Sequence, residues 1–308
     1  MWQKTQMRIF NRKHIAVIAA CFLILLTSTS VFSSGQSPIV ELTQEEQAYL
    51  NDKKQLTFVC DPAWPPYEHI DENHKYVGIA ADYLQLFSEA LGVPFKRIPT
   101  RSWLESVAIA KSGRSDFVSL LNRTPERERF LDFTEPYFGS QMVIIGKEDV
   151  WLDKGLTDIP NKTIAVVDGY WYTELMRNKF PQITRLRTQS VQEALQAVDK
   201  GKAYAFITTV IEASYYVRNN RLSELHIIGD TQHSNKLSVG VRKDEMVLLS
   251  IMQKAVDSIT EVQKEQIRVK WLSNNVEELP VNYTIPAILI GFLLLVLVAG
   301  IYVYRKIY

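Results

Sequence analysis

The sequence predicts an α/β fold in which short buried strands alternate with amphipathic helices. Between about residues 56 and 272, apolar runs alternate with stretches of helical periodicity, a pattern typical of α/β layers. The alternation falls into two successive units, which indicates two lobes. The 308 residues and the formal net charge of +1 fit a globular protein of one or two domains. This near-neutral charge gives no reason to expect nucleic-acid binding.

The first unit opens with a buried strand, Leu56–Cys60. A helix is predicted over Ala80–Leu91 because its apolar residues share one helical face. A second helix, Ser102–Lys111, begins at a Ser cap and ends near Gly113. Two further strands complete this unit: Asp116–Leu121 and Gln141–Gly146.

The second unit opens with the strand Thr163–Val167. The helix Tyr170–Phe180 stops before Pro181, and the helix Ser190–Lys200 carries its apolar residues on one face. The remaining predicted elements are the strand Ala203–Ile207, the helix Val210–Arg218, the strand Leu237–Val241, which returns to the first lobe, and the closing helices Met246–Ile259 and Glu261–Trp271.

Two motifs of the first unit stand in a characteristic order. Residues 61–67 read DPAWPPY directly after an apolar strand, and residues 122–138 read NRTPERERFLDFTEPYF. Together they resemble the first lobe of the type 3 extracytoplasmic solute-binding proteins, over about residues 50–275. The resemblance implies a two-lobed type II periplasmic-binding-protein (Venus-flytrap) fold that closes on a small ligand. The sequence carries no catalytic constellation, so no enzymatic activity is expected. An enzyme on this fold, such as the dehydratases among the family's relatives, is the third hypothesis, with Asp168 and Glu212 as its candidates for proton transfer.

The two lobes are expected to be joined by two crossings, near Gly146–Glu148 and Asn235–Leu237. Such a double connection suits hinge closure. Residues 50–146 with 237–272 would then form lobe 1, and residues 147–236 would form lobe 2.

Arg127 is the first candidate ligand-binding residue. A guanidinium offers two parallel hydrogen bonds to a carboxylate, and the family resemblance gives the arginine of T-x-E-R this role. The alternative is that Arg127 pairs with Glu126 or Asp132 on a solvated turn. Asn122 could supply its amide to the same carboxylate, and Thr124 is expected to cap the short helix that follows.

Aromatic residues are expected to form walls of the ligand site. Trp64 and Tyr67 lie in a Pro-stiffened loop, and at least one should face the cleft. Trp103 is expected in the core. In the second unit, Tyr170 and Trp171 could stack on a ligand at the start of a helix.

The ligand class follows from departures from the family pattern. The resemblance implies an acid just after the strand Ala203–Ile207 in amino-acid binders, but Thr208 and Thr209 stand there. A carboxylate-bearing ligand without an amine is therefore favoured. Amino acids stay open, because Asp168 or Glu212 could replace the missing acid.

Both ends of the chain predict membrane association. A basic start followed by apolar residues 15–26 indicates a signal peptide or an uncleaved anchor over residues 1–34; a lipid anchor at Cys21 is the third reading. Residues 285–304 form a charge-free apolar span until the basic tail 305–308, which places that tail in the cytoplasm. The remaining cysteine, Cys60, is expected to be a core residue.

The segment 237–271 also resembles the periplasmic sensor modules of transmembrane histidine kinases and diguanylate cyclases. The expected protein is a sensor in the bacterial inner membrane, with its ligand-binding domain in the periplasm and a kinase or cyclase output in the cytoplasm or on a partner. The alternative is a tethered solute-binding protein that serves a transporter. No metal-ligand spacing or phosphate loop is found, so no metal or cofactor is expected.

Overall fold

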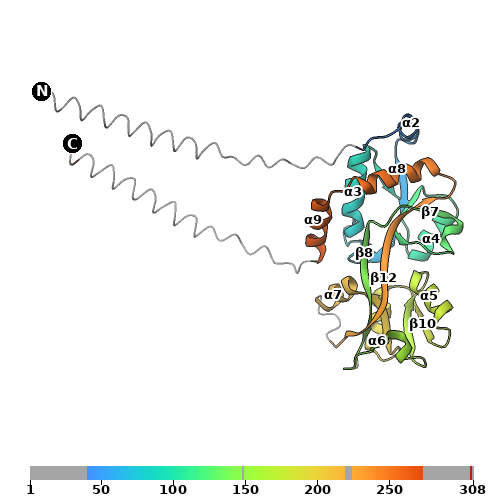
Figure 1. Cartoon of the computed structure of the whole chain (residues 1–308), viewed down its shortest axis with the longest axis vertical. Coiled ribbons are helices and arrows are strands. Elements are labelled where there is room, and N and C mark those ends of the chain that lie inside the picture. The colour runs from blue at the N-terminus through green and yellow to red at the C-terminus, as the bar shows by residue number, and fades with distance from the viewer. Residues whose placement is uncertain (1–39, 148, 219–223, 273–305, 307–308) are drawn as a thin grey trace. The chain divides into compact units, whose positions relative to one another are not determined.

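The computed structural model describes residues 40–147, 149–218, 224–272 and 306. Within these residues the chain forms two lobes connected by long strands (Figure 1). No helix of the described residues is long and apolar enough to cross a membrane. The predicted segments 1–34 and 285–304 lie outside the described residues, as does all of the tail 305–308 except residue 306.

One sheet runs through both lobes, in the order β10-β9-β11-β8-β12-β6-β1-β5, with β7 paired to β12. At one end β9, β10 and β11 are parallel neighbours, and at the other β1, β5 and β6 are parallel neighbours. A small sheet of β2, β3 and β4 lies apart from it. The strands are β1 Leu56–Val59, β2 Ala63–Trp64, β3 Glu68–Ile70, β4 Tyr76–Val77, β5 Phe95–Arg97, β6 Phe117–Asn122, β7 Leu131–Phe133, β8 Phe138–Gly146, β9 Thr163–Val167, β10 Thr184–Thr188, β11 Ala205–Thr209 and β12 His226–Arg242.

The long antiparallel pair β8 and β12 connects the two lobes (Figure 1). The first part of β12 pairs with β8, which also carries β11 of the second lobe, and Gly229 forms an isolated bridge to Leu152. From Leu237 onward β12 pairs with β6 and β7 of the first lobe. The predicted return of the chain at Leu237–Val241 is therefore confirmed, although the strand begins at His226.

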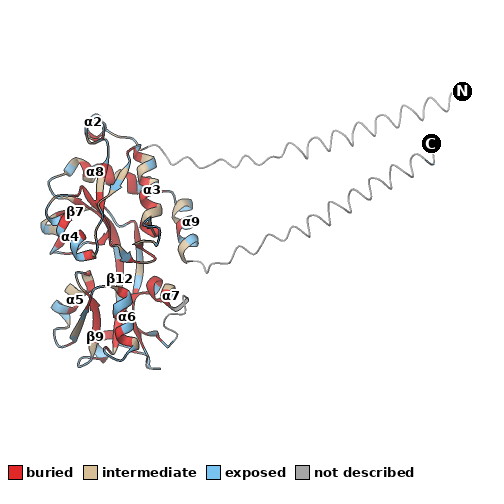
Figure 2. Cartoon of the chain, turned by 180° about the vertical axis from the view of Figure 1, so that it is seen from behind, coloured by how far each residue is buried: buried red, intermediate tan, exposed pale blue. Residues whose placement is uncertain are grey.

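Helices cover the sheet in both lobes, and buried residues concentrate along the strands between them (Figure 2). The predicted helices are found close to their expected limits, and Ser102 and Ser190 cap two of them as polar N-caps do. The helices are α2 Gln44–Lys53, α3 Ile79–Leu91, α4 Trp103–Lys111, α5 Trp171–Lys179, α6 Val191–Asp199, α7 Val210–Arg218, α8 Met246–Asp257 and α9 Glu261–Leu272, with the 3₁₀ turns η1 Arg127–Arg129 and η2 Gly155–Asp158.

The start of α3 fixes the entry to the first lobe. Gly78 precedes the helix with φ 130°, and a Cβ there would lie 2.5 Å from the backbone oxygen of Tyr67. A side chain cannot occupy that space, so Gly78 allows the Trp64–Tyr67 loop to pack directly against α3.

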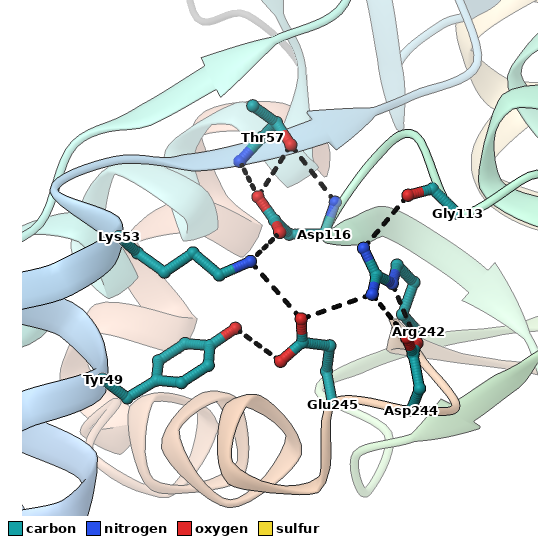
Figure 3. Close-up of polar contacts among 8 residues, drawn as sticks. All are labelled: Tyr49, Lys53, Thr57, Gly113, Asp116, Arg242, Asp244 and Glu245. Atoms are coloured by element: carbon teal, nitrogen blue, oxygen red, sulfur yellow. Dashed lines mark hydrogen bonds and ion pairs between the residues drawn. The ribbon is translucent and has the colours of Figure 1, made fainter.

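Helices α2 and α9 both lie on the first lobe. A polar cluster fixes the end of α2: Lys53 pairs with Asp116 at 2.8 Å, and Tyr49 donates to Glu245 at 2.9 Å (Figure 3). On α9, Trp271 Nε1 donates to Asp82 Oδ2 of α3 at 2.6 Å. Both helices are thus docked on the same lobe.

Candidate functional site

A pocket that opens to solvent is lined by residues of both lobes. The lining combines aromatic rings, two acids and one arginine. Its residues are Asp61, Trp64, Trp103, Leu120, Leu121, Asn122, Arg127, Met142, Tyr170, Trp171, Tyr172, Thr209, Glu212 and Asn235.

The Pro-rich loop after β1 places Trp64 in the pocket wall. The Trp64 ring lies 4.4 Å from the Tyr67 ring, centroid to centroid, and its Nε1 donates to Glu212 Oε1 at 2.8 Å. Tyr67 is fully buried beside it, and its hydroxyl donates to Thr209 Oγ1 at 2.9 Å. One aromatic of the pair therefore lines the pocket, and the other supports it while bonding across to the second lobe.

Arg127 begins the turn η1, which follows β6, and only 6% of its surface is exposed. The Arg127 backbone N–H donates to Thr124 Oγ1, but the N-cap of this turn is Glu126 and not the expected Thr124. The Arg127 guanidinium donates to Asn122 O at 2.7 Å and to Gly169 O at 2.9 Å, and lies 5.4 Å from the Trp103 ring centroid. Burial lowers the pKa of Arg127 to about 10. The solvated-turn alternative is wrong, because the side chain is buried.

The loop between β9 and α5 supplies the opposite wall. Gly169, with φ 76°, brings its backbone oxygen within 3.0 Å of Trp103 Nε1, and a Cβ there would lie 2.9 Å from Leu104. Tyr170 and Trp171 line the pocket, and the Tyr170 hydroxyl donates to Asp61 Oδ2 at 2.7 Å. Asp168 instead accepts from Arg187 at 2.6 Å and does not line the pocket.

An acid of the second lobe reaches the pocket from α7. Glu212 Oε2 accepts a hydrogen bond from Thr209 Oγ1 at 3.0 Å. Thr209, the last residue of β11, thus holds the carboxylate of a residue three positions later in the chain. Thr209 lines the pocket, whereas Thr208 is buried outside the lining. Thr208 and Thr209 stand where amino-acid binders carry an acid, but Glu212 in the first turn of α7 brings a carboxylate to the same pocket.

Burial dominates the electrostatics of the acids. It raises the pKa of Asp61 to about 6 and that of Glu212 to about 7, despite the hydrogen bonds that favour their charged forms. Beneath the loop, Glu68 accepts from the Asp61 backbone N–H at 2.8 Å, and burial raises its pKa to about 8. Glu68 thereby positions Asp61 from below.

The structure brings six of the predicted site residues into the pocket: Trp64, Asn122, Arg127, Tyr170, Trp171 and Thr209. Tyr67, Thr208 and Asp168 do not line it. Sequence reasoning missed Asp61, Tyr172 and Asn235. Trp103 is buried in the core, as expected, and it also lines the pocket. Asp61 lies at the carboxyl end of a buried strand, a position that could have marked it. Cys60 is buried and free, as expected.

Two lobes that share long strands and enclose a polar pocket define a ligand-binding clamshell. The chain belongs to the bacterial extracellular solute-binding proteins, family 3, whose family model matches residues 56–274. The two-lobed Venus-flytrap fold inferred from the motifs is confirmed.

Sensor proteins are among the relatives, which confirms the resemblance to sensor modules. The virulence sensor protein BvgS of Bordetella pertussis is 26% identical over 227 residues, which are 73% of this chain and 18% of that protein. The sensor protein EvgS of Escherichia coli K12 is 22% identical over 236 residues, 76% of this chain and 19% of that protein. The chain thus matches less than a fifth of either sensor's length.

Similar solved structures and transport proteins point to the same fold. The periplasmic VFT2 domain of B. pertussis BvgS has a TM-score of 0.68 at 26% identity, covering 75% of this chain and 99% of that one. The ABC transporter arginine-binding protein 1 of E. coli K12 is 24% identical over 211 residues, 67% of this chain and 85% of that protein.

Proposed function

We propose that this chain is the extracytoplasmic ligand-binding part of a membrane-anchored sensor, and that it closes on a small carboxylate-bearing ligand. The observation that carries the proposal is the buried pocket lined from both lobes, with Arg127 in its wall. A ligand held between two lobes favours the closed arrangement by its difference in affinity for the open and closed forms.

Arg127 is the proposed anchor for the carboxylate. Its two amino groups donate to backbone carbonyls, Asn122 O of its own lobe and Gly169 O of the other. A carboxylate that replaced the Gly169 bond would gain a charge-assisted hydrogen bond. The exchange would be favourable because a low-dielectric pocket strengthens such a bond.

The sensor role is supported by the relatives and by the chain ends. BvgS and EvgS are named as sensor proteins. The apolar segment 285–304 follows α9 closely enough to carry a movement of the lobe into the membrane. We propose that the chain lies in the bacterial inner membrane with residues 50–272 in the periplasm, and that a kinase or cyclase output, in cis or on a partner, reads its state.

A second candidate function is delivery of an amino acid or organic acid to a transporter. It is favoured by the arginine-binding relative and by the presence of Glu212 in the pocket, where an amine could find an acid. In this case the apolar ends would serve only as tethers.

A melting screen on the full chain in lipid nanodiscs tests the proposed ligand class. Organic acids, amino acids and their deaminated analogues are added in turn, since a ligand that binds the folded state raises the melting temperature by mass action. We expect a carboxylate to be required among the stabilising compounds. Stabilisation that is indifferent to loss of the carboxylate would contradict the assignment of Arg127.

A further inference from the structure

Helix α9 carries an apolar stripe on the face that points away from its own lobe. Val262 is 67% exposed and Val269 is 50% exposed, whereas Ile267 is buried against the lobe. At about 100° per residue, the two valines lie about 20° apart around the helix, and each lies about 140° to 160° from Ile267. Val262 is also the most exposed of the large apolar side chains in the described residues. The stripe is therefore separate from the contacts that hold α9 in place.

The helix itself is fixed, although its outer face is exposed. Figures 1 and 2 show α9 at the outside of α3, and Trp271 and Lys270 hold it there through Asp82. Neither valine packs against the core of the described residues or lines the ligand pocket. A helix that is already docked loses little conformational freedom when its outer face meets a partner. The outer face of α9 is thus preorganised for an interaction.

The apolar residues of this face have the spacing of a coiled-coil seam. A heptad register with Val262 at position a gives six a and d positions before Pro280, and only Glu265 among them is not apolar. The six are Val262, Glu265, Val269, Leu272, Val276 and Leu279, of which the last two lie outside the described residues. Leu272 is shared, because it also packs against the lobe. An a and d repeat of this kind favours pairing with another helix.

The charges around the stripe favour a protein partner over a lipid surface. Glu261, Glu265 and Arg268 are exposed beside the valines, so this face carries no excess of basic residues. Helices that lie on a membrane surface are instead rich in Lys and Arg beside their apolar face. Arg268 pairs with Glu265 at 3.9 Å within α9, which offsets the charge of the one polar seam position. A single polar residue in such a seam fixes the register of the paired helices.

We propose that the outer face of α9, marked by Val262 and Val269, pairs with the same face of a second copy of this chain in a parallel dimer. The same residues of both copies meet, as an interface with two-fold symmetry requires. The direction follows from the short stretch 273–284 between α9 and the apolar segment 285–304, because two copies inserted in one membrane present α9 in the same orientation. Only this direction rests on the proposed membrane anchoring, and the pairing itself does not depend on any ligand.

Cysteine cross-linking in the membrane tests the dimer without any ligand. Val262→Cys and Val269→Cys are introduced one at a time into the full chain with Cys21→Ser, which leaves only the buried Cys60. Copies with two different epitope tags are co-expressed and mildly oxidised. We expect each variant to give about tenfold more disulfide-linked species with both tags than Leu104→Cys does, since a disulfide needs Cβ atoms about 4 Å apart. Leu104 is the matched control, because it lies on α4 and is 50% exposed, as Val269 is.

A charge on the stripe provides the second test. Adding Val262→Lys to the Val269→Cys variant should lower cross-linking by about tenfold, because like charges then face each other across the two-fold axis. Leu104→Lys is the control and should leave cross-linking unchanged, and circular dichroism confirms that each variant is folded.

Two outcomes would overturn the dimer. Lipid or a different protein on this face predicts that Val262→Cys and Val269→Cys give no more species with both tags than Leu104→Cys does. A stronger link between the two different variants than within either one contradicts the parallel direction. A failure of the ligand screen beside intact cross-linking counts against the proposed ligand class and leaves the dimer standing.

Discussion

Arg127 illustrates how much one side chain of this protein depends on its surroundings. It is anchored by two backbone carbonyls, one from each lobe, and packs on Trp103. The bond to Gly169 O therefore links the lobes through a residue that is also the proposed ligand anchor. Trp64 and Tyr170 likewise line the pocket and also link the lobes. Trp64 donates a hydrogen bond to Glu212, and Tyr170 donates one to Asp61.

Replacing Arg127 by Ala should abolish binding of carboxylate ligands. Removal of one partner from a buried charge pair costs about 2–5 kcal/mol, which is a loss in affinity of about 30-fold or more. Isothermal titration calorimetry on the full chain would measure it. Arg177→Ala, which removes an exposed partner of Glu126, is the control. An unchanged affinity for Arg127→Ala would exclude this residue from the site.

The contribution of three buried acids to the stability of the ligand-free protein should fall as the pH rises from about 4 to about 8. The folded-state pKa values of Asp61, Glu212 and Glu68 are raised to about 6, 7 and 8. The folded state thus binds more protons than the unfolded state in this window. The contribution of these groups to stability is therefore fully present below the unfolded pKa values and is lost as the pH rises through the folded-state pKa values. Melting temperature against pH measures the effect.

The variant Glu212→Gln tests the origin of this slope. It removes one of the three titrating groups and should flatten the curve between about pH 5 and pH 7, by an amount of order a few kcal/mol in unfolding free energy. Glu193→Gln, at the exposed start of α6, should leave the curve unchanged. A melting temperature that rises steadily with pH in the parent would contradict the sign.

At the scale of elements, the docking of α9 on α3 depends on few contacts. Ile267 is buried against the lobe, and Asp82 of α3 accepts from Trp271 Nε1 and pairs with Lys270 at 2.8 Å. Trp271 and Leu272 also pack against the core. The last turn of α9 thus combines apolar packing with the polar contacts to Asp82.

Replacing Asp82 by Ala should loosen α9 without unfolding the lobe. The loss of one charged hydrogen bond and a half-exposed ion pair should cost about 1–2 kcal/mol locally. Hydrogen exchange of the amides in 261–272 should become faster, while β1 and β6 stay protected. Lys264→Ala removes an exposed pair within the same helix and is the matched control. Equal exchange in both variants would show that Asp82 does not hold the helix.

The elements that sequence reasoning found are those with clear periodicity, such as α3 and α6. Helix α2 was missed because QEEQAYLNDK has few apolar residues; its buried positions are Glu46 and Leu50, and Glu46 is held by Lys254 at 2.6 Å. The part of β12 that reads GDTQHSNK is polar, and it pairs with β8. Such segments become ordered through distant partners, which a local pattern does not contain.

Site residues could be predicted from the sequence where a single motif contains them. They could not be predicted where the fold brings together residues from separate elements. Arg127 and Trp64 follow from motifs of single loops. Asp61, Trp103 and Asn235 reach the pocket from separate elements, and only the tertiary arrangement reveals that they face one another. The boundaries of the lobes at residues 146 and 237 stay predictions, as does the membrane topology.

At the scale of the whole molecule, the proposed sensor function would require that closure of the lobes is transmitted to the membrane segment. We expect that a flexible Gly-Ser insertion near Asn275, which lies outside the described residues, leaves ligand affinity intact and uncouples the output. The reason is that a rigid connection transmits a rotation and a flexible chain does not. Kinase or cyclase activity with and without ligand provides the measurement. A rigid helical insertion of equal length is the control, and wild-type output with the flexible one would favour the tethered-transport function.

The shared docking of α2 and α9 has a mechanical consequence. Because both helices are fixed to the first lobe, by Lys53 and Glu245 at one place and by Asp82 at another, a rotation of the second lobe alone would leave the spacing between the two helices unchanged. Under the proposed sensor function, a response across the membrane would therefore require the first lobe itself to turn and to carry both helices with it.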